Sequence, residues 1–191
     1  MIEDLSFHDV SLASTTWEQA KHSESFEQLG IGTILRLFEL KPEFKTAFGF
    51  DINSKIDSST VGMVRMAILI HGKDIIDTVD AVFGALGPDI DILTELLAEL
   101  ATSHKSFGAD YFRFLGIAVG DVLQPMLGET KWTRAVQRAW SAVFQEVSTG
   151  IAKAMGQEVV LTPVEKESTT QIRPRRMSGA AAALLTHTQR T

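Results

Sequence analysis

The feature that most constrains this chain is a helical spacing of apolar residues that continues from Thr16 to Met155. Over this stretch apolar side chains recur at positions i, i+3, i+4 and i+7, as on one face of a helix. Few runs alternate apolar and polar residues as a half-buried strand does. The five prolines leave long intervals in which a helix meets no breaker. The sequence therefore predicts an all-α fold.

Helix boundaries follow from the start and stop signals between these intervals. We predict six helices and one short helical turn. They cover residues 14–21, 26–40, a turn after Pro42, 64–86, 90–104, 109–127 and 130–155. Ser14, Asp89 and either Thr130 or Thr133 supply the side-chain oxygens that cap helix starts.

Length and composition indicate one domain followed by a tail. A chain of 191 residues with 45% hydrophobic content can bury one good core but falls short of two ordinary domains. We place the domain at 1–155, with its core at about 14–155. Residues 156–191 are poor in aromatics and carry five basic side chains against three acidic ones. Such a segment cannot offset its ordering entropy, so we expect a flexible, disordered tail.

Composition also excludes several classes of protein. The absence of cysteine rules out disulfides, thiolate zinc sites and iron–sulfur ligation. A net charge of −6 repels phosphate backbones, which makes nucleic acid a poor partner. Uncharged stretches such as 66–72 and 178–189 are too short to cross a bilayer, and the first residues lack a signal-peptide pattern. We therefore expect a soluble, cytoplasmic protein that does not bind membranes.

Two histidines stand on apolar helical faces. His71 begins a stripe that continues through Ile75, Val79 and Val82, so we expect it to point inward. An inward imidazole needs a partner, because burying an unpaired polar group costs about 1–3 kcal/mol.

The second histidine, His104, ends a helical face made of leucines. These are Leu93, Leu96, Leu97 and Leu100. A histidine at the last turn of a helix can donate from one ring nitrogen to a carbonyl one turn earlier, here that of Leu100. The other nitrogen is then free to bind a metal.

Taken singly, each histidine is more often an ordinary core residue than a ligand. Two inward histidines without a third ligand nearby do not form a closed zinc site. They do match the two axial positions of a haem, since the porphyrin supplies the other four nitrogens. An all-α protein with two satisfied core histidines and no haem is the alternative.

The order of landmarks in residues 16–155 resembles the globin family. The matching segments are Trp17 in the first helix, ILRLFELKPEFKTAF at 34–48, HGKDIIDTVDAVF from His71, LAELATSHKSFG ending at Gly108, and AWSAVF from Ala139. Phe48 to His71 is 23 residues and His71 to His104 is 33, similar to the neuroglobin and cytoglobin group of single-domain haem globins. The block HGKD, with Gly72 after the histidine, favours His71 over a register that places Val61 or Gly62 at the distal position.

This resemblance implies one haem b, with His104 as the proximal ligand and His71 as the distal residue. The other residues that it implies around the porphyrin are Phe48, Ile75, Leu100, Ile34, Phe107 and Phe112, with Ala109 on the far wall. Leu100 and Ser103 are expected to offer the oxygens that orient His104. Phe107, Ala109 and Phe112 are interpreted equally well as plain core. Asp74 stands where a base often meets a haem propionate, so either Lys73 or Lys105 takes that role or the propionate is left to solvent.

The function implied by the resemblance is reversible binding of oxygen, nitric oxide or carbon monoxide to ferrous haem. His71 could donate a hydrogen bond to the bound gas or close the sixth iron position itself. Two alternatives remain. One is nitric oxide dioxygenation or nitrite reduction with a separate reductase, and the other is a haem-based redox or gas sensor. We expect a monomer or a homodimer.

Overall fold

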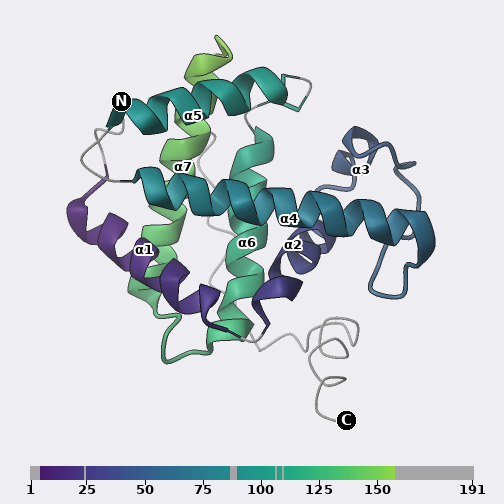
Figure 1. The fold of residues 1–191 in the computed structure, drawn as a ribbon, viewed down its shortest axis with the longest axis horizontal. Coiled ribbons are helices and arrows are strands. Elements are labelled where there is room, and N and C mark those ends of the chain that lie inside the picture. The colour runs from purple at the N-terminus through teal and green to yellow at the C-terminus, as the bar shows by residue number, and fades with distance from the viewer. Residues whose placement is uncertain (1–4, 24, 87–89, 106, 109, 158–191) are drawn as a thin grey trace, which may run out of the picture.

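The computed structural model describes residues 5–23, 25–86, 90–105, 107–108 and 110–157. Within them lie seven α-helices and no strand, which confirms the predicted all-α fold (Figure 1). The helices are α1 (Phe7–Lys21), α2 (Phe26–Leu40), α3 (Phe44–Ala47), α4 (Gly62–Ala85), α5 (Ile90–Ser103), α6 (Asp110–Leu127) and α7 (Arg134–Ala154). Asp89, Ala109 and the predicted tail from residue 158 onward lie outside the described residues.

The helix starts that differ most from the sequence prediction are those of α1 and α7. The predicted start at Ser14 is wrong, because α1 begins two turns earlier, where the Ser6 hydroxyl accepts from the backbone N–H of Asp9 at 3.0 Å. That cap stands before the regular apolar spacing begins, so periodicity alone passed over it. At α7 the cap is Thr133, which accepts from Val136 N–H at 3.3 Å, and Thr130 lies in the preceding turn.

The helices pack in two connected groups. Helix α2 lies against both α4 and α6, and α7 lies against α1, α5 and α6. In Figure 1 the long helix α4 crosses the front of the molecule, with α7 and α6 behind it. Among the described residues, no helix is both long and apolar enough to span a membrane.

The core between α1, α4 and α7 is aromatic. Trp17 is fully buried and stacks on Phe83 with ring centroids 5.7 Å apart, and Phe83 lies 5.0 Å from Trp140. The Trp17 indole N–H donates to the Asp80 carboxylate at 2.7 Å, and Lys21 donates to the same oxygen at 2.9 Å. The indole bond, followed by the lysine bond, lowers the pKa of Asp80. These contacts fasten the C-terminal half of α4 to α1.

Helices α2 and α4 meet at two glycines. A Cβ on Gly30 would lie 2.4 Å from the Gly72 carbonyl oxygen, and one on Gly72 would lie 2.8 Å from the Gly30 carbonyl carbon. Backbone atoms cannot yield to such contacts, so only glycine fits at either position. The crossing therefore fixes how far α4 can slide or rotate against α2.

Candidate functional site

His104 lies immediately after the last residue of α5. Leu93, Leu97 and Leu100 on that helix are buried, as the leucine face predicts. The His104 backbone N–H donates to the Leu100 carbonyl at 3.0 Å, and the ring Nδ1 lies 3.0 Å from the same oxygen. A carbonyl oxygen can only accept, so Nδ1 donates and Nε2 keeps its lone pair. The predicted bond is present, and it leaves one nitrogen free for a metal.

Ser103 does not share this orienting role. Its hydroxyl donates to the Glu99 carbonyl at 2.9 Å on the exposed side of α5. A serine hydroxyl within a helix readily reaches the backbone carbonyl four residues earlier. It is less well placed to reach the imidazole of a residue beyond the end of the helix. The expectation that Ser103 helps to orient His104 is therefore wrong.

Aromatic rings surround the His104 imidazole. Phe107 and Phe112 each have their ring centroid 5.5 Å from it, and Phe112 meets it edge-on. Tyr111, which the sequence analysis missed, stacks on the imidazole at 6.3 Å with an interplanar angle of 15°. Burial raises the pKa of Tyr111, which keeps its phenol neutral. Its signal in the sequence was its place beside Phe112, in the first turn of the helix after His104.

His71 lies in the middle of α4, and its side chain is exposed rather than buried in the core as its helical face predicts. The stripe that it begins is buried from Ile75 onward, at Val79, Val82 and Phe83. The packing of α1, α5 and α7 covers those later turns, whereas His71 lies where α4 passes the segment that follows α3. Its imidazole meets the Phe48 ring edge-on, with centroids 5.2 Å apart and an interplanar angle of 87°.

The backbone beside His71 is nevertheless fixed. Gly72, the next residue, is one of the two glycines at the α2–α4 crossing. The crossing holds the Cα of His71 in place, while the exposed side chain meets the edge of Phe48. His71 thus combines a fixed backbone with a less enclosed ring.

Phe48 connects the two histidines through a series of ring contacts. Its ring lies 5.2 Å from His71 and 6.4 Å from Phe107, which in turn lies 5.5 Å from His104. Phe38 of α2 supports it edge-on at 5.1 Å. The remaining predicted residues, Ile34, Ile75 and Leu100, are buried in the core.

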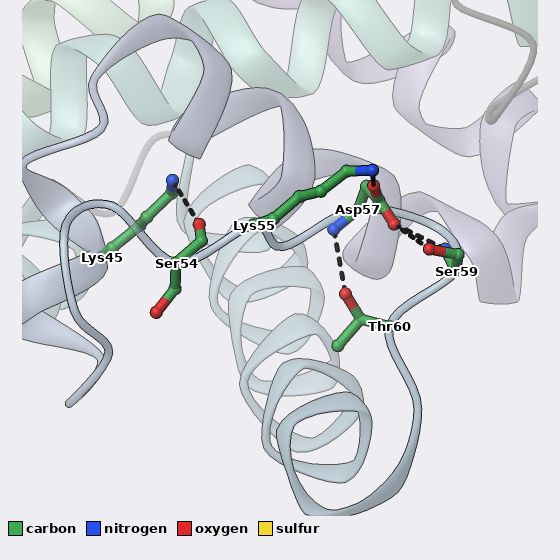
Figure 2. Close-up of polar contacts among 6 residues, drawn as sticks. All are labelled: Lys45, Ser54, Lys55, Asp57, Ser59 and Thr60. Atoms are coloured by element: carbon green, nitrogen blue, oxygen red, sulfur yellow. Dashed lines mark hydrogen bonds and ion pairs between the residues drawn. The ribbon is translucent and has the colours of Figure 1, made fainter.

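Polar contacts order the segment between α3 and α4 (Figure 2). Lys45 donates from Nζ to the carbonyls of Ser54 at 2.9 Å and Ile52 at 3.2 Å. Further along, the Asp57 carboxylate accepts from the Ser59 backbone N–H at 2.9 Å and from its hydroxyl. The Ser59 hydroxyl bond is the main cause of the lowered pKa of Asp57. The sequence analysis assigned nothing to this segment.

The lysines expected near a propionate have different surroundings. Lys73 pairs with Asp77 on the next turn of α4, and that bond raises the pKa of the ammonium group. Lys105 and Asp74 are exposed. A role for Lys73 or Lys105 toward a propionate stays a prediction.

The donor set fits a haem. One imidazole is held by a backbone carbonyl with a free Nε2, a second comes from another helix, and phenylalanine rings lie between them. A porphyrin supplies four of the iron ligands, so one or two imidazoles complete the coordination. Within the described residues, no three histidine, aspartate or glutamate side chains gather as a metal site.

Comparisons with known proteins agree with this arrangement. The family model described as Globin matches residues 32–151. The neuroglobins of Dissostichus mawsoni and Chaenocephalus aceratus are each 28% identical to this chain over 158 residues, which is 80% of this chain and 96% of theirs.

Among solved structures, a hexacoordinated haem protein from an anhydrobiotic tardigrade is similar in fold. Its TM-score is 0.65 at 19% sequence identity, over 81% of this chain and 97% of that one. The match of the family model over most of the chain confirms the resemblance seen in the sequence and supports haem-based gas binding in general. This chain belongs to the globin family.

Proposed function

We propose that this protein binds one haem b through His104 and uses it to bind oxygen, nitric oxide or carbon monoxide reversibly. The observation that carries the proposal is the bond from His104 Nδ1 to the Leu100 carbonyl, which fixes the tautomer with Nε2 free. Ferrous haem, when bound, supplies an open axial position for a small gas.

The rings around His104 give that imidazole a defined orientation and exclude water. Phe107, Tyr111 and Phe112 surround it, and Tyr111 and Phe112 are buried. A dry, apolar surrounding slows loss of the cofactor and favours ferrous iron over its charged oxidised form. We assign these rings, with Phe48, to the walls of the haem site.

His71 is assigned to the distal side, where it has two possible tasks. It can donate an N–H to a polar gas ligand, or its Nε2 can occupy the second axial position, with which a gas then competes. We propose the second, bis-histidyl state as the resting form. Its support is the exposed ring on a fixed backbone, together with the hexacoordinated tardigrade protein of similar fold.

Titration with haemin tests the proposal. The purified chain should develop a Soret band that saturates at one haem per chain. His104→Ala should weaken haem retention by about a hundredfold or more, because the anchored ligand is lost. His8→Ala, at an exposed histidine on α1, is the matched control and should behave as the parent. Absence of the band, or a band unchanged by His104→Ala, would sink the proposal.

Spectra of the reduced protein test the role of His71. Bis-histidyl ligation gives sharp, split visible bands in the deoxygenated ferrous form, and His71→Ala should replace them with one broad band. A single broad band in the parent protein would show that His71 leaves the axial position open.

A further inference from the structure

We infer that Lys45 is a positioning residue for the distal side of the site, holding Phe48 and through it the His71 imidazole. The inference rests on the proposed function, since it assigns Lys45 a role in how His71 meets an axial ligand. It comes from a side chain that lies outside the ring contacts and to which the sequence patterns assign no role.

Lys45 forms hydrogen bonds with the segment after α3 through both its backbone carbonyl and its side chain. Its carbonyl accepts from the backbone N–H groups of Phe48 at 3.1 Å and Phe50 at 2.9 Å. Its ammonium group reaches over the segment to the carbonyls of Ile52 and Ser54 (Figure 2 shows the latter). A charged donor shared by two carbonyls holds a loop more firmly than neutral bonds do. Lys45 therefore bonds Phe48 and Phe50 through its backbone carbonyl, and residues 52 and 54 through its side chain.

Phe48 carries this restraint to His71. Its ring has an edge-on contact with the imidazole at 5.2 Å, and Phe38 supports it from α2. Because Gly72 already fixes the α4 backbone, the freedom that remains at His71 is its rotamer. The Phe48 edge restricts that rotamer. Removing the side-chain bonds of Lys45 should therefore let Phe48 move and leave the His71 imidazole in a less defined orientation.

Lys55 in the same segment offers a matched control. Its side chain is 89% exposed, and it makes an ion pair with Asp57 at 3.5 Å. Such a pair at the surface contributes little. Replacing either lysine by methionine keeps a side chain of similar length and removes the charge. The two variants therefore differ mainly in that only Lys45→Met loses bonds to backbone carbonyls, one of which Figure 2 shows.

The first readout is the rate at which carbon monoxide binds to the ferrous haem-loaded protein after rapid mixing. Lys45→Met should speed association by about three- to tenfold, because a poorly directed His71 competes less well for the axial position or obstructs it less. Lys55→Met should leave the rate within about twofold of the parent. Lys45→Arg can still donate to both carbonyls and should restore most of the parent rate.

The second readout is amide hydrogen exchange, measured on the haem-loaded chains and on the same chains without haem. The Phe50 and Ser54 amides should exchange faster in Lys45→Met and unchanged in Lys55→Met. Equal carbon monoxide rates in the two methionine variants would overturn the inference, whether or not exchange differs. A parent chain that takes up no haem would instead refute the proposed function, and the exchange comparison would still report on the restraint.

Discussion

The two histidines of this protein are held in opposite ways. On the proximal side the ring is fixed: His104 bonds through Nδ1 to Leu100 and is surrounded by three aromatic side chains. On the distal side the backbone is fixed: Gly72 packs against Gly30, while the His71 ring is exposed and meets one edge of Phe48.

If the two histidines hold haem as proposed, this difference separates a permanent ligand from an adjustable one. A ring held by a hydrogen bond and by packing loses its conformational entropy on folding, before any metal binds. A ring with fewer contacts loses more of that entropy on binding itself, so it binds iron more weakly and its affinity can be tuned. Four sets of variants, taken from the largest expected effect to the smallest, test the contacts behind this contrast and along α4.

The largest effect should come from the fixed backbone of the distal side. Gly30→Ala places a Cβ 2.4 Å from the Gly72 carbonyl oxygen, so the two helices must separate. We expect the free energy of unfolding to fall by about 2–4 kcal/mol. Urea unfolding followed by far-ultraviolet circular dichroism measures it.

A glycine elsewhere in α4 serves as the control. A Cβ on Gly84 meets nothing within 4 Å, so Gly84→Ala should be neutral or stabilise the chain by up to about 1 kcal/mol. Similar losses for the two variants would show that the crossing is no tighter than the rest of the helix.

The packing of the proximal ring is tested next. Tyr111→Leu removes the ring that stacks on His104 and leaves space in a buried position, 4% exposed in the parent. The expected loss of stability is about 1–3 kcal/mol, from lost burial and lost ring contacts. Phe114→Leu, at a partly buried ring in the same helix, should cost less. An equal or greater loss at Phe114 would contradict the importance given to Tyr111.

The histidines themselves should differ in the haem-free chain. His104→Ala removes the Nδ1 bond to Leu100 and the ring contacts, for about 1 kcal/mol of stability. His71→Ala removes an exposed ring and should change stability by less than about 0.5 kcal/mol. Thermal unfolding of both variants without haemin decides the matter. If His71→Ala proved the more destabilising, the proposed contrast between the two sides would be reversed.

The smallest effect concerns the far end of α4, at Asp80. The Trp17 and Lys21 bonds lower the pKa of this carboxyl, whose ordinary value is about 3.9. Its stabilising contribution is therefore complete above that value and is lost as the pH falls through the lower, folded pKa. Asp80→Asn should cost at most about 0.5–1 kcal/mol at neutral pH, since the carboxylate is 49% exposed and screened.

Unfolding measured as a function of pH checks this. The parent and Asp80→Asn should differ near pH 7 and converge as the pH falls through the lowered pKa of the folded state. Asp74→Asn, at an exposed position of the same helix, should show no comparable convergence. A difference that grew on acidification would contradict the sign argued for Asp80.

Local patterns in the sequence predicted much of this molecule. The 26–40 helix matches α2 at both ends. The predicted last residues of α4, α5, α6 and α7 lie within one residue of those observed. The bond from His104 to Leu100 joins residues four apart, so helical geometry alone indicates it. The start of α1 was missed because its cap, Ser6, stands ahead of the regular apolar spacing.

Contacts between distant residues could not be predicted in the same way. The Gly30–Gly72 crossing joins two helices whose relative rotation the sequence does not state, and the Lys45 bonds depend on the path of an irregular segment. His71 was expected inward because its helical face is apolar in the following turns. The assembled fold decides which turns of that face are covered by other helices.

The glycine crossing also limits how descendants of this protein can change. A mutation at Gly30 or Gly72 is blocked by the backbone of the other helix, and inserting one residue between the crossing and His71 would turn the imidazole to another face of α4. Selection for tighter or looser gas binding must therefore act on the side chains that border the crossing. In such a lineage, substitutions at Phe48 and in the segment after it can change gas affinity while the α2–α4 crossing stays the same.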